Sequence, residues 1–154
     1  ARIVAADIDR SRLEFARKQG LADEFVDPSE VSLTEALREW TQGRGADVVI
    51  EAAGGKDSFR LAWQAARPNA VVVIAAMYEE AQILPLPEMY GKNLIFKTGG
   101  VDACNCREIL ELTARGKLKG ECLITHRAPL ADAMEIYRLF ENKEKGIIKA
   151  ALTP

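Results

Sequence analysis

The chain has 154 residues, of which 48% are hydrophobic and 29% are charged, and its formal net charge is −2. This composition suits one globular domain of ordinary size and excludes intrinsic disorder as the main state. The near balance of 21 basic and 23 acidic residues also argues against nucleic acid or an anionic membrane surface as a partner.

Membrane-spanning segments, signal peptides and cysteines indicate the cellular compartment of a protein. The longest apolar runs, such as 71–77, are too short to span a bilayer, and no signal peptide is recognisable. Three cysteines are an odd number and too few for a disulfide scaffold, so we expect a reducing, cytoplasmic setting. The chain also begins inside an apparent buried strand, which suggests a piece of something longer.

The first hundred residues predict strands that alternate with helices. In chain order we expect a strand at 2–7, a helix from 9 to the glycine at 20, a short strand at 24–28, a helix at 31–41, a strand at 47–53, a helix at 58–67, a turn at 68–69, a strand at 70–77, a loop with two prolines and a strand at 93–97. This alternation is typical of an α/β fold in which helices cover both faces of a parallel sheet. We therefore predict a Rossmann-like doubly wound sheet, which binds its ligands at the carboxyl ends of the strands.

The pattern loosens after residue 100. There we expect a helix at 107–114, a strand at 123–127, a helix at 130–141 and a last strand at 146–152. This tail suits a second layer or domain, so the predicted division is 1–100 and 101–154.

Asp7 is the first candidate binding residue. A carboxylate at the tip of an early buried strand can accept hydrogen bonds from both hydroxyls of an adenosine ribose, and it repels the 2′-phosphate of NADP. An ordinary helix N-cap or a surface aspartate is an equally good interpretation of its position. Arg10 and Arg12 leave the choice of cofactor open, because arginines there could accept a 2′-phosphate. The chain contains no Gly-x-Gly-x-x-Gly motif; its Gly54-Gly55 and Gly99-Gly100 pairs follow later strands.

A metal site would have to use the late cysteines and the single histidine. Cys104-x-Cys106 and Cys122-x-x-x-His126 offer four ligands of the kinds that zinc accepts. The first spacing is tighter than usual and Cys122 begins a predicted strand, so we predict no metal here. Half-buried thiols and a His126 ring that is hydrogen-bonded at a strand end suit the pattern better.

Five segments, in order, resemble the cofactor-binding half of the medium-chain, zinc-dependent alcohol dehydrogenases. They are Ala-Arg-Ile-Val-Ala-Ala-Asp-Ile-Asp (1–9), Gly-Arg-Gly-Ala-Asp-Val-Val-Ile-Glu-Ala-Ala-Gly (43–54), Asn-Leu-Ile-Phe-Lys-Thr-Gly-Gly (93–100), Leu-Ile-Thr-His-Arg (123–127) and Gly-Ile-Ile-Lys-Ala-Ala-Leu-Thr-Pro (146–154). Each segment alone is a weak signal, but the five together cover essentially the whole chain.

The resemblance implies roles for particular residues. Asp7 would hold the adenosine ribose, with Arg12 beside it, and Lys149 would contact the cofactor phosphates. Ala52 and Ala53, at the end of the fourth strand of the family fold, would line the adenine–ribose and nicotinamide cleft. Ala75, Ala76 and Met77 end the next strand, where the family's backbone groups hydrogen-bond the nicotinamide carboxamide. From the residues alone, plain strand packing explains the four alanines better, and a solvated surface lysine explains Lys149 better.

The resemblance also implies what lies outside the chain. The family's zinc ligands and glycine fingerprint precede the matching segments, as does its first strand, which is central in the order 3-2-1-4-5-6. We therefore interpret the chain as the C-terminal part of an NAD-dependent alcohol dehydrogenase, incomplete at its N-terminus and inactive by itself. The intact enzyme would transfer a hydride from a small alcohol or polyol to NAD, with zinc from the absent half as Lewis acid.

Two other interpretations stay open. One is a zinc-free quinone or enoyl reductase of the same superfamily, which would typically prefer NADPH. The other is a non-catalytic module that keeps the nucleotide-domain shape only to dimerise. The family's strand near 94–97 lies at a sheet edge, so a homo-oligomer, dimer or tetramer, is expected in any of these cases.

Overall fold

The computed structural model describes residues 1–100 and 103–154 of the chain. The described residues form two compact units. The first unit contains residues 1–8 and 23–100, and the second contains residues 9–22 and 103–154.

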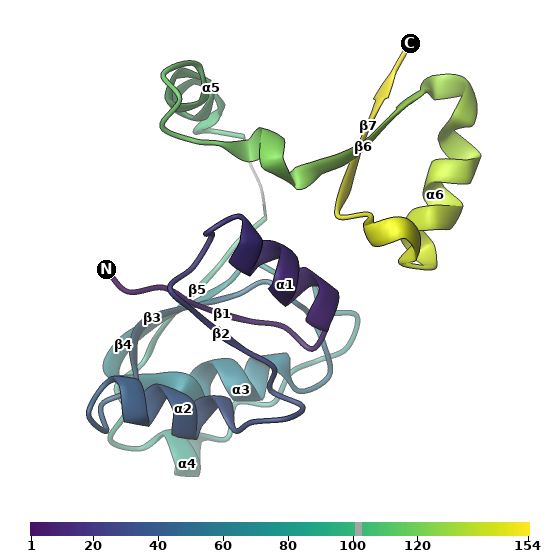
Figure 1. Ribbon diagram of the computed structural model, residues 1–154. Coiled ribbons are helices and arrows are strands. Elements are labelled where there is room, and N and C mark those ends of the chain that lie inside the picture. Colours follow the sequence, from purple (N-terminus) through teal and green to yellow (C-terminus); the bar gives the residue numbers. More distant parts are fainter. Residues whose placement is uncertain (101–102) are drawn as a thin grey trace. The chain divides into compact units, whose positions relative to one another are not determined.

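Every strand pair of the first unit is parallel (Figure 1). Its strands are β1 (Val4–Ala6), β2 (Glu24–Val26), β3 (Ala46–Glu51), β4 (Ala66–Ile74) and β5 (Ile95–Thr98). β1 pairs with β2, and β3, β4 and β5 form a second sheet in that order. These pairings are the 3-2 and 4-5-6 portions of a doubly wound sheet, so the predicted α/β fold with parallel strands is confirmed. No strand of the described residues pairs with both β1 and β3, which would flank the first strand of that order.

The core of the first unit lies between its helices and one face of the sheet β3–β4–β5. The helices are α2 (Leu33–Trp40), α3 (Ser58–Ala65) and the single turn α4 (Leu86–Met89), and they lie on one side of the strands in Figure 1. Ala62 of α3 packs with Ala66, Ala70 and Val72 of β4. A second cluster joins Phe59, Trp63 and Met89. Ile74, the last residue of β4, packs against the second cluster, so these side chains hold the start of α3 close to the carboxyl end of β4.

The other face of β3 is exposed. Side chains alternate between the two faces of a strand, and Val49 points into the core cluster. Its neighbours Val48 and Ile50 point the other way, with 57% and 68% of their surface exposed. Strands of parallel sheets are usually covered on both faces, so this apolar face suits a larger assembly than the first unit alone.

The side chain of Lys92 caps the C-terminal end of α3. Its ammonium group donates to the carbonyl oxygens of Trp63, Gln64 and Ala66, at 2.9, 3.0 and 2.8 Å. These are carbonyls of the last helical turn, which have no partner within a helix. The Lys92 side chain therefore fixes the junction between α3 and β4.

The second unit contains a further parallel strand pair. Its elements are α1 (Arg10–Lys18), α5 (Cys106–Ala114), the short turn η1 (Gly120–Leu123), β6 (Ile124–Pro129), η2 (Leu130–Asp132), α6 (Ala133–Glu141), η3 (Glu144–Gly146) and β7 (Lys149–Thr153). β6 pairs with β7, and α6 connects them. No helix among the described residues is long and apolar enough to cross a membrane.

The predictions for two connecting segments were wrong in detail. The turn expected at 68–69 lies inside β4, where Ala66 pairs with Ala46 and, after an irregularity, Val71 pairs with Val48. Asn69 has a φ of +59° there and donates its N–H to the carbonyl of Lys92, so the turn residues form a bulge within the strand. The loop with two prolines contains α4, since proline suits the first turn of a helix.

Candidate functional site

The candidate site lies where β3 and β4 end, at the carboxyl edge of the parallel sheet. β4 ends at Ile74 and not at the predicted residue 77. The next two N–H groups, of Ala75 and Ala76, turn to one acceptor, the main-chain oxygen of Glu51, at 2.8 and 3.2 Å. The last residue of β3 thereby holds the segment that follows β4.

The loop after β3 touches that same segment. Gly54 has a φ of +65°, and a Cβ atom built on it would lie 2.7 Å from the carbonyl oxygen of Met77. Only glycine allows both this backbone conformation and this approach. Ala52 and Ala53, and the segment 75–77, were predicted separately to line a cofactor cleft, and they therefore lie on neighbouring loops.

The buried Glu51 side chain holds the loop after β3 through hydrogen bonds. It is only 5% exposed, and its Oε1 accepts hydrogen bonds from the N–H groups of Ala53 at 2.8 Å and Gly54 at 2.9 Å. Its Oε2 is buried without a hydrogen bond to any described residue. Buried carboxylates are costly unless hydrogen-bonded, so this one points to a specific role.

Two hydroxyl groups lie beside this carboxylate. Ser58 Oγ, at the start of α3, donates to the carbonyl of Gly55 at 2.8 Å and lies 3.0 Å from the hydroxyl of Tyr78. Either hydroxyl can be the donor in this pair.

Both ionisable groups of this cluster have shifted pKa values. Burial on its own would raise the pKa of Glu51, but the nearby Tyr78 hydroxyl, the N–H groups of Gly54 and Ala53 and the Ser58 hydroxyl together lower it below its ordinary value. Burial, with the nearby Glu51 carboxylate, raises the pKa of Tyr78 to about 12. The cluster therefore holds a charged Glu51 next to a neutral Tyr78 at neutral pH.

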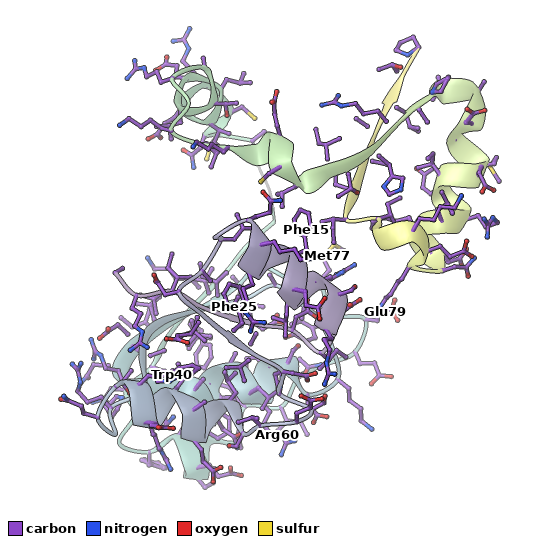
Figure 2. All side chains as sticks on the ribbon, in the orientation of Figure 1. Phe15, Phe25, Trp40, Arg60, Met77 and Glu79 are labelled. Carbon is purple, nitrogen blue, oxygen red and sulfur yellow. The ribbon has the colours of Figure 1, made fainter. Side chains whose placement is uncertain are left out.

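Most of the predicted lining residues at this edge face solvent. Ala52, Ala53 and Ala75 are exposed, and Ala76 is half-buried. Met77 is 94% exposed, and Figure 2 labels it on the segment that follows β4. Strand packing therefore does not explain the three exposed alanines, and they leave the backbone open to a ligand.

The other predicted binding residues lie elsewhere. Asp7 directly follows β1, is half-buried and donates its N–H to the carbonyl of Val26. The N-cap of α1 is Asp9, which accepts from the N–H groups of Ser11 and Arg12, so Asp7 is not the cap. The guanidinium of Arg12 lies 3.8 Å from the carboxylate of Asp9. Arg12 and Lys149 both belong to the second unit, and Lys149 is exposed at the start of β7.

The residues considered for zinc do not form a metal centre. Among residues 1–100 and 103–154, no three His, Cys, Asp or Glu side chains come close enough to share a metal ion. His126 is half-buried in β6 with Nδ1 3.0 Å from the Thr125 hydroxyl. Cys122 donates through its Sγ to the carbonyl of Lys119. The cysteines and the histidine considered for zinc therefore do not share a cluster of three ligands in the described part of the chain.

The residues at the carboxyl edge of the sheet suit a dinucleotide better than the late cysteines and the histidine suit zinc. Small exposed side chains at the ends of two adjacent parallel strands allow a flat ring to approach the backbone, and a carboxylate at the end of β1 suits a ribose diol. The glycine-rich turn that would hold a pyrophosphate is not in the sequence. The residues present fit the ribose and the nicotinamide portions, and not the whole cofactor.

Three residues of the site were missed from the sequence: Glu51, Ser58 and Tyr78. The signal for Glu51 was available, because a carboxylate ends an otherwise apolar run, Val48-Val49-Ile50, and directly precedes Ala-Ala-Gly-Gly. No comparable signal marks Ser58 or Tyr78, because their contact spans twenty residues of sequence.

A family model and the similar proteins of known function agree on one protein family. The model of the zinc-binding dehydrogenase family matches residues 1–113. An alcohol dehydrogenase of Cupriavidus necator is 28% identical over 99% of this chain and 42% of its own length. D-xylulose reductase A of Aspergillus oryzae is 31% identical over 88% of this chain and 39% of its own length.

Solved structures agree. The alcohol dehydrogenase TADH from Thermus sp. ATN1 superimposes with a TM-score of 0.90 at 28% identity, over 99% of this chain and 44% of that one. The rspB alcohol dehydrogenase of Escherichia coli CFT073, complexed with NADH, gives a TM-score of 0.88 at 27% identity, over 99% of this chain and 44% of that one. The chain thus spans less than half the length of these relatives and matches their C-terminal part.

Proposed function

Because this chain belongs to the zinc-binding dehydrogenase family, we propose that it is the cofactor-binding part of an NAD-dependent alcohol or polyol dehydrogenase. The observation that carries the proposal is the contact between the loops after β3 and β4, at the carboxyl edge of a parallel sheet. In this proposal residues 1–100 form the partial dinucleotide-binding domain, and residues 101–154 return toward the catalytic domain.

The proposed work of these residues is to bind and orient the cofactor. Asp7 accepts hydrogen bonds from the two ribose hydroxyls, and Arg12 and Lys149 supply positive charge near the sugar and the phosphates. Ala52, Ala53, Ala75, Ala76 and Met77 offer backbone groups and small contacts to the nicotinamide side. NAD, when bound, supplies the acceptor for the hydride of the alcohol carbon. Holding the ring in a fixed orientation is the contribution of the protein to such a transfer.

Other parts of the proposal concern the intact protein. A zinc ion that polarises the alcohol oxygen would be held by the catalytic part of the intact protein. The relatives named alcohol dehydrogenase and D-xylulose reductase support a small alcohol or polyol as substrate. A cytoplasmic homo-oligomer, a dimer or a tetramer, completes the proposal, and the chain alone is expected to be inactive.

The test is an assay of the intact protein, with the chain alone as control. NADH formation is followed with a panel of small secondary alcohols and polyols. The proposal expects turnover by the intact protein with at least one of them and none by the chain alone. Activity as an NADPH-dependent quinone or enoyl reductase would replace the proposal, and an intact protein that binds neither dinucleotide would favour the dimerising module.

A further inference from the structure

We propose that Glu51 is a positioning residue that locks the loops after β3 and β4 together and so sets the surface on which the nicotinamide side of the cofactor lies. This inference rests on the proposed function. Glu51 itself is buried and does not reach the cofactor surface.

Glu51 acts on both loops through different atoms. Its main-chain oxygen receives the N–H groups of Ala75 and Ala76, and its side-chain Oε1 receives those of Ala53 and Gly54. One residue thus orders four backbone N–H groups at the ends of two neighbouring strands. The loop after β3 has no strand partner of its own, so the carboxylate replaces the ladder that ends at this point.

Because Gly54 lies so close to Met77, the position of one loop depends on the position of the other. A Cβ atom built on Gly54 would lie only 2.7 Å from the Met77 oxygen, so the backbones of the two loops are in close contact. A small rotation of the loop after β3 therefore changes the separation of the two loops. If the carboxylate is lost, the N–H groups of Ala53 and Gly54 must find other partners, and the loop has to move. Displacement of cofactor contacts by about 1 Å is enough to weaken the productive geometry.

A carboxylate suits this position better than an amide. Hydrogen bonds from N–H groups to an ionised oxygen are stronger than those to a neutral one. The Tyr78 and Ser58 hydroxyls beside the group also help to keep it ionised despite its burial. A glutamine would keep an acceptor for the two N–H groups but would lose the charge, so it should preserve part of the function.

The experiment compares three variants of the intact protein. Glu51→Gln removes only the charge, and Glu51→Ala removes the whole carboxylate. Asp47→Asn is the matched control. Asp47 lies on the same strand, is exposed and pairs with Arg67 away from the two loops. The readouts are the Kd for NADH by fluorescence titration, kcat and KM for NAD, and hydrogen exchange of the Ala53 and Gly54 amides without cofactor.

The inference expects a graded result. Glu51→Ala should raise the Kd for NADH about tenfold, equivalent to about 1.4 kcal/mol, and Glu51→Gln should raise it less. Both should raise KM for NAD more than they lower kcat, and both should speed exchange of the two amides. Asp47→Asn should match the unmodified protein in all three readouts. Equal affinity and equal exchange in the unmodified protein and in Glu51→Gln and Glu51→Ala would overturn the inference.

The design separates this inference from the proposed function. If the unmodified protein binds no NADH, the proposed function fails, while amide exchange still reports whether Glu51 positions the loop. If Glu51→Ala does not fold, Glu51→Gln decides alone: unchanged affinity and unchanged exchange would then refute the positioning role.

Discussion

The backbone at Gly54 approaches Met77 so closely that a Cβ atom there would lie 2.7 Å from the Met77 carbonyl oxygen. This contact joins two loops that are separated by more than twenty residues in sequence. It also gives a prediction in which two adjacent glycines behave differently.

Gly54→Ala should destabilise the protein, and Gly55→Ala should not. The left-handed backbone alone costs an alanine about 1–2 kcal/mol, and the contact with Met77 adds to it, so we expect a loss of about 2 kcal/mol or more. Gly55 has no atom within 4 Å of a built Cβ and no positive φ. Urea unfolding of the intact protein measures both, and equal stability of the two variants would contradict the described loop contact.

Lys92→Met should also destabilise the protein. It removes three charge-assisted hydrogen bonds and leaves the carbonyls of Trp63, Gln64 and Ala66 without that donor, at an expected cost of about 3 kcal/mol. Lys97→Met is the control, since Lys97 is exposed on β5 and its replacement should change stability by no more than about 0.5 kcal/mol. A Lys92→Met protein as stable as its control would show that the contact with the end of α3 contributes little.

The charge of Glu51 should make stability depend on pH. Its folded pKa lies below the ordinary value of 4.5, so its contribution is fully present above 4.5 and is lost as pH falls through the folded value. Glu51→Gln has no such group, so the stability difference between the two proteins should shrink below pH 4.5. Unfolding curves from neutral to acid pH measure this difference, and a constant gap would argue against an ionised Glu51.

Tyr78 should titrate late. Burial, together with the nearby Glu51, raises its pKa to about 12 from the ordinary 10.0, so any stabilisation linked to its neutral form is lost as pH rises through that interval. The difference in tyrosinate absorbance between the unmodified protein and Tyr78→Phe isolates this group. A midpoint near pH 12 is expected, and one at the ordinary value would place Tyr78 in solvent.

The sequence predicts the elements of this fold better than it predicts their ends. Apolar runs and helical spacing identify each strand of the first unit, because burial dictates those patterns. The end of β4 at Ile74 does not follow from composition: Val-Val-Val-Ile-Ala-Ala-Met is apolar throughout, and only the turn of Ala75 toward Glu51 stops the strand. The bulge at Asn69 depends in the same way on a partner from outside, Lys92.

The candidate site shows the same limit. The segments around Ala52 and Ala75 can be placed from the sequence because the carboxyl ends of parallel strands meet at one edge. The side chains that hold them together could not be placed, since Ser58 and Tyr78 meet only after folding. Glu51 does stand out in the sequence at the end of an apolar run, but its burial could not be predicted, because a charged residue in that place usually marks the first solvated position.

Binding of NADH and NADPH to the intact protein tests the central claim most directly, with Asp7→Ser as the comparison. We expect the unmodified protein to bind NADH at least about tenfold more tightly than NADPH, because in the proposed function the Asp7 carboxylate bonds the ribose diol and would repel a 2′-phosphate. Asp7→Ser should lose most of this preference through weaker NADH binding. An unmodified protein that prefers NADPH, or a variant with unchanged affinities, would contradict the account.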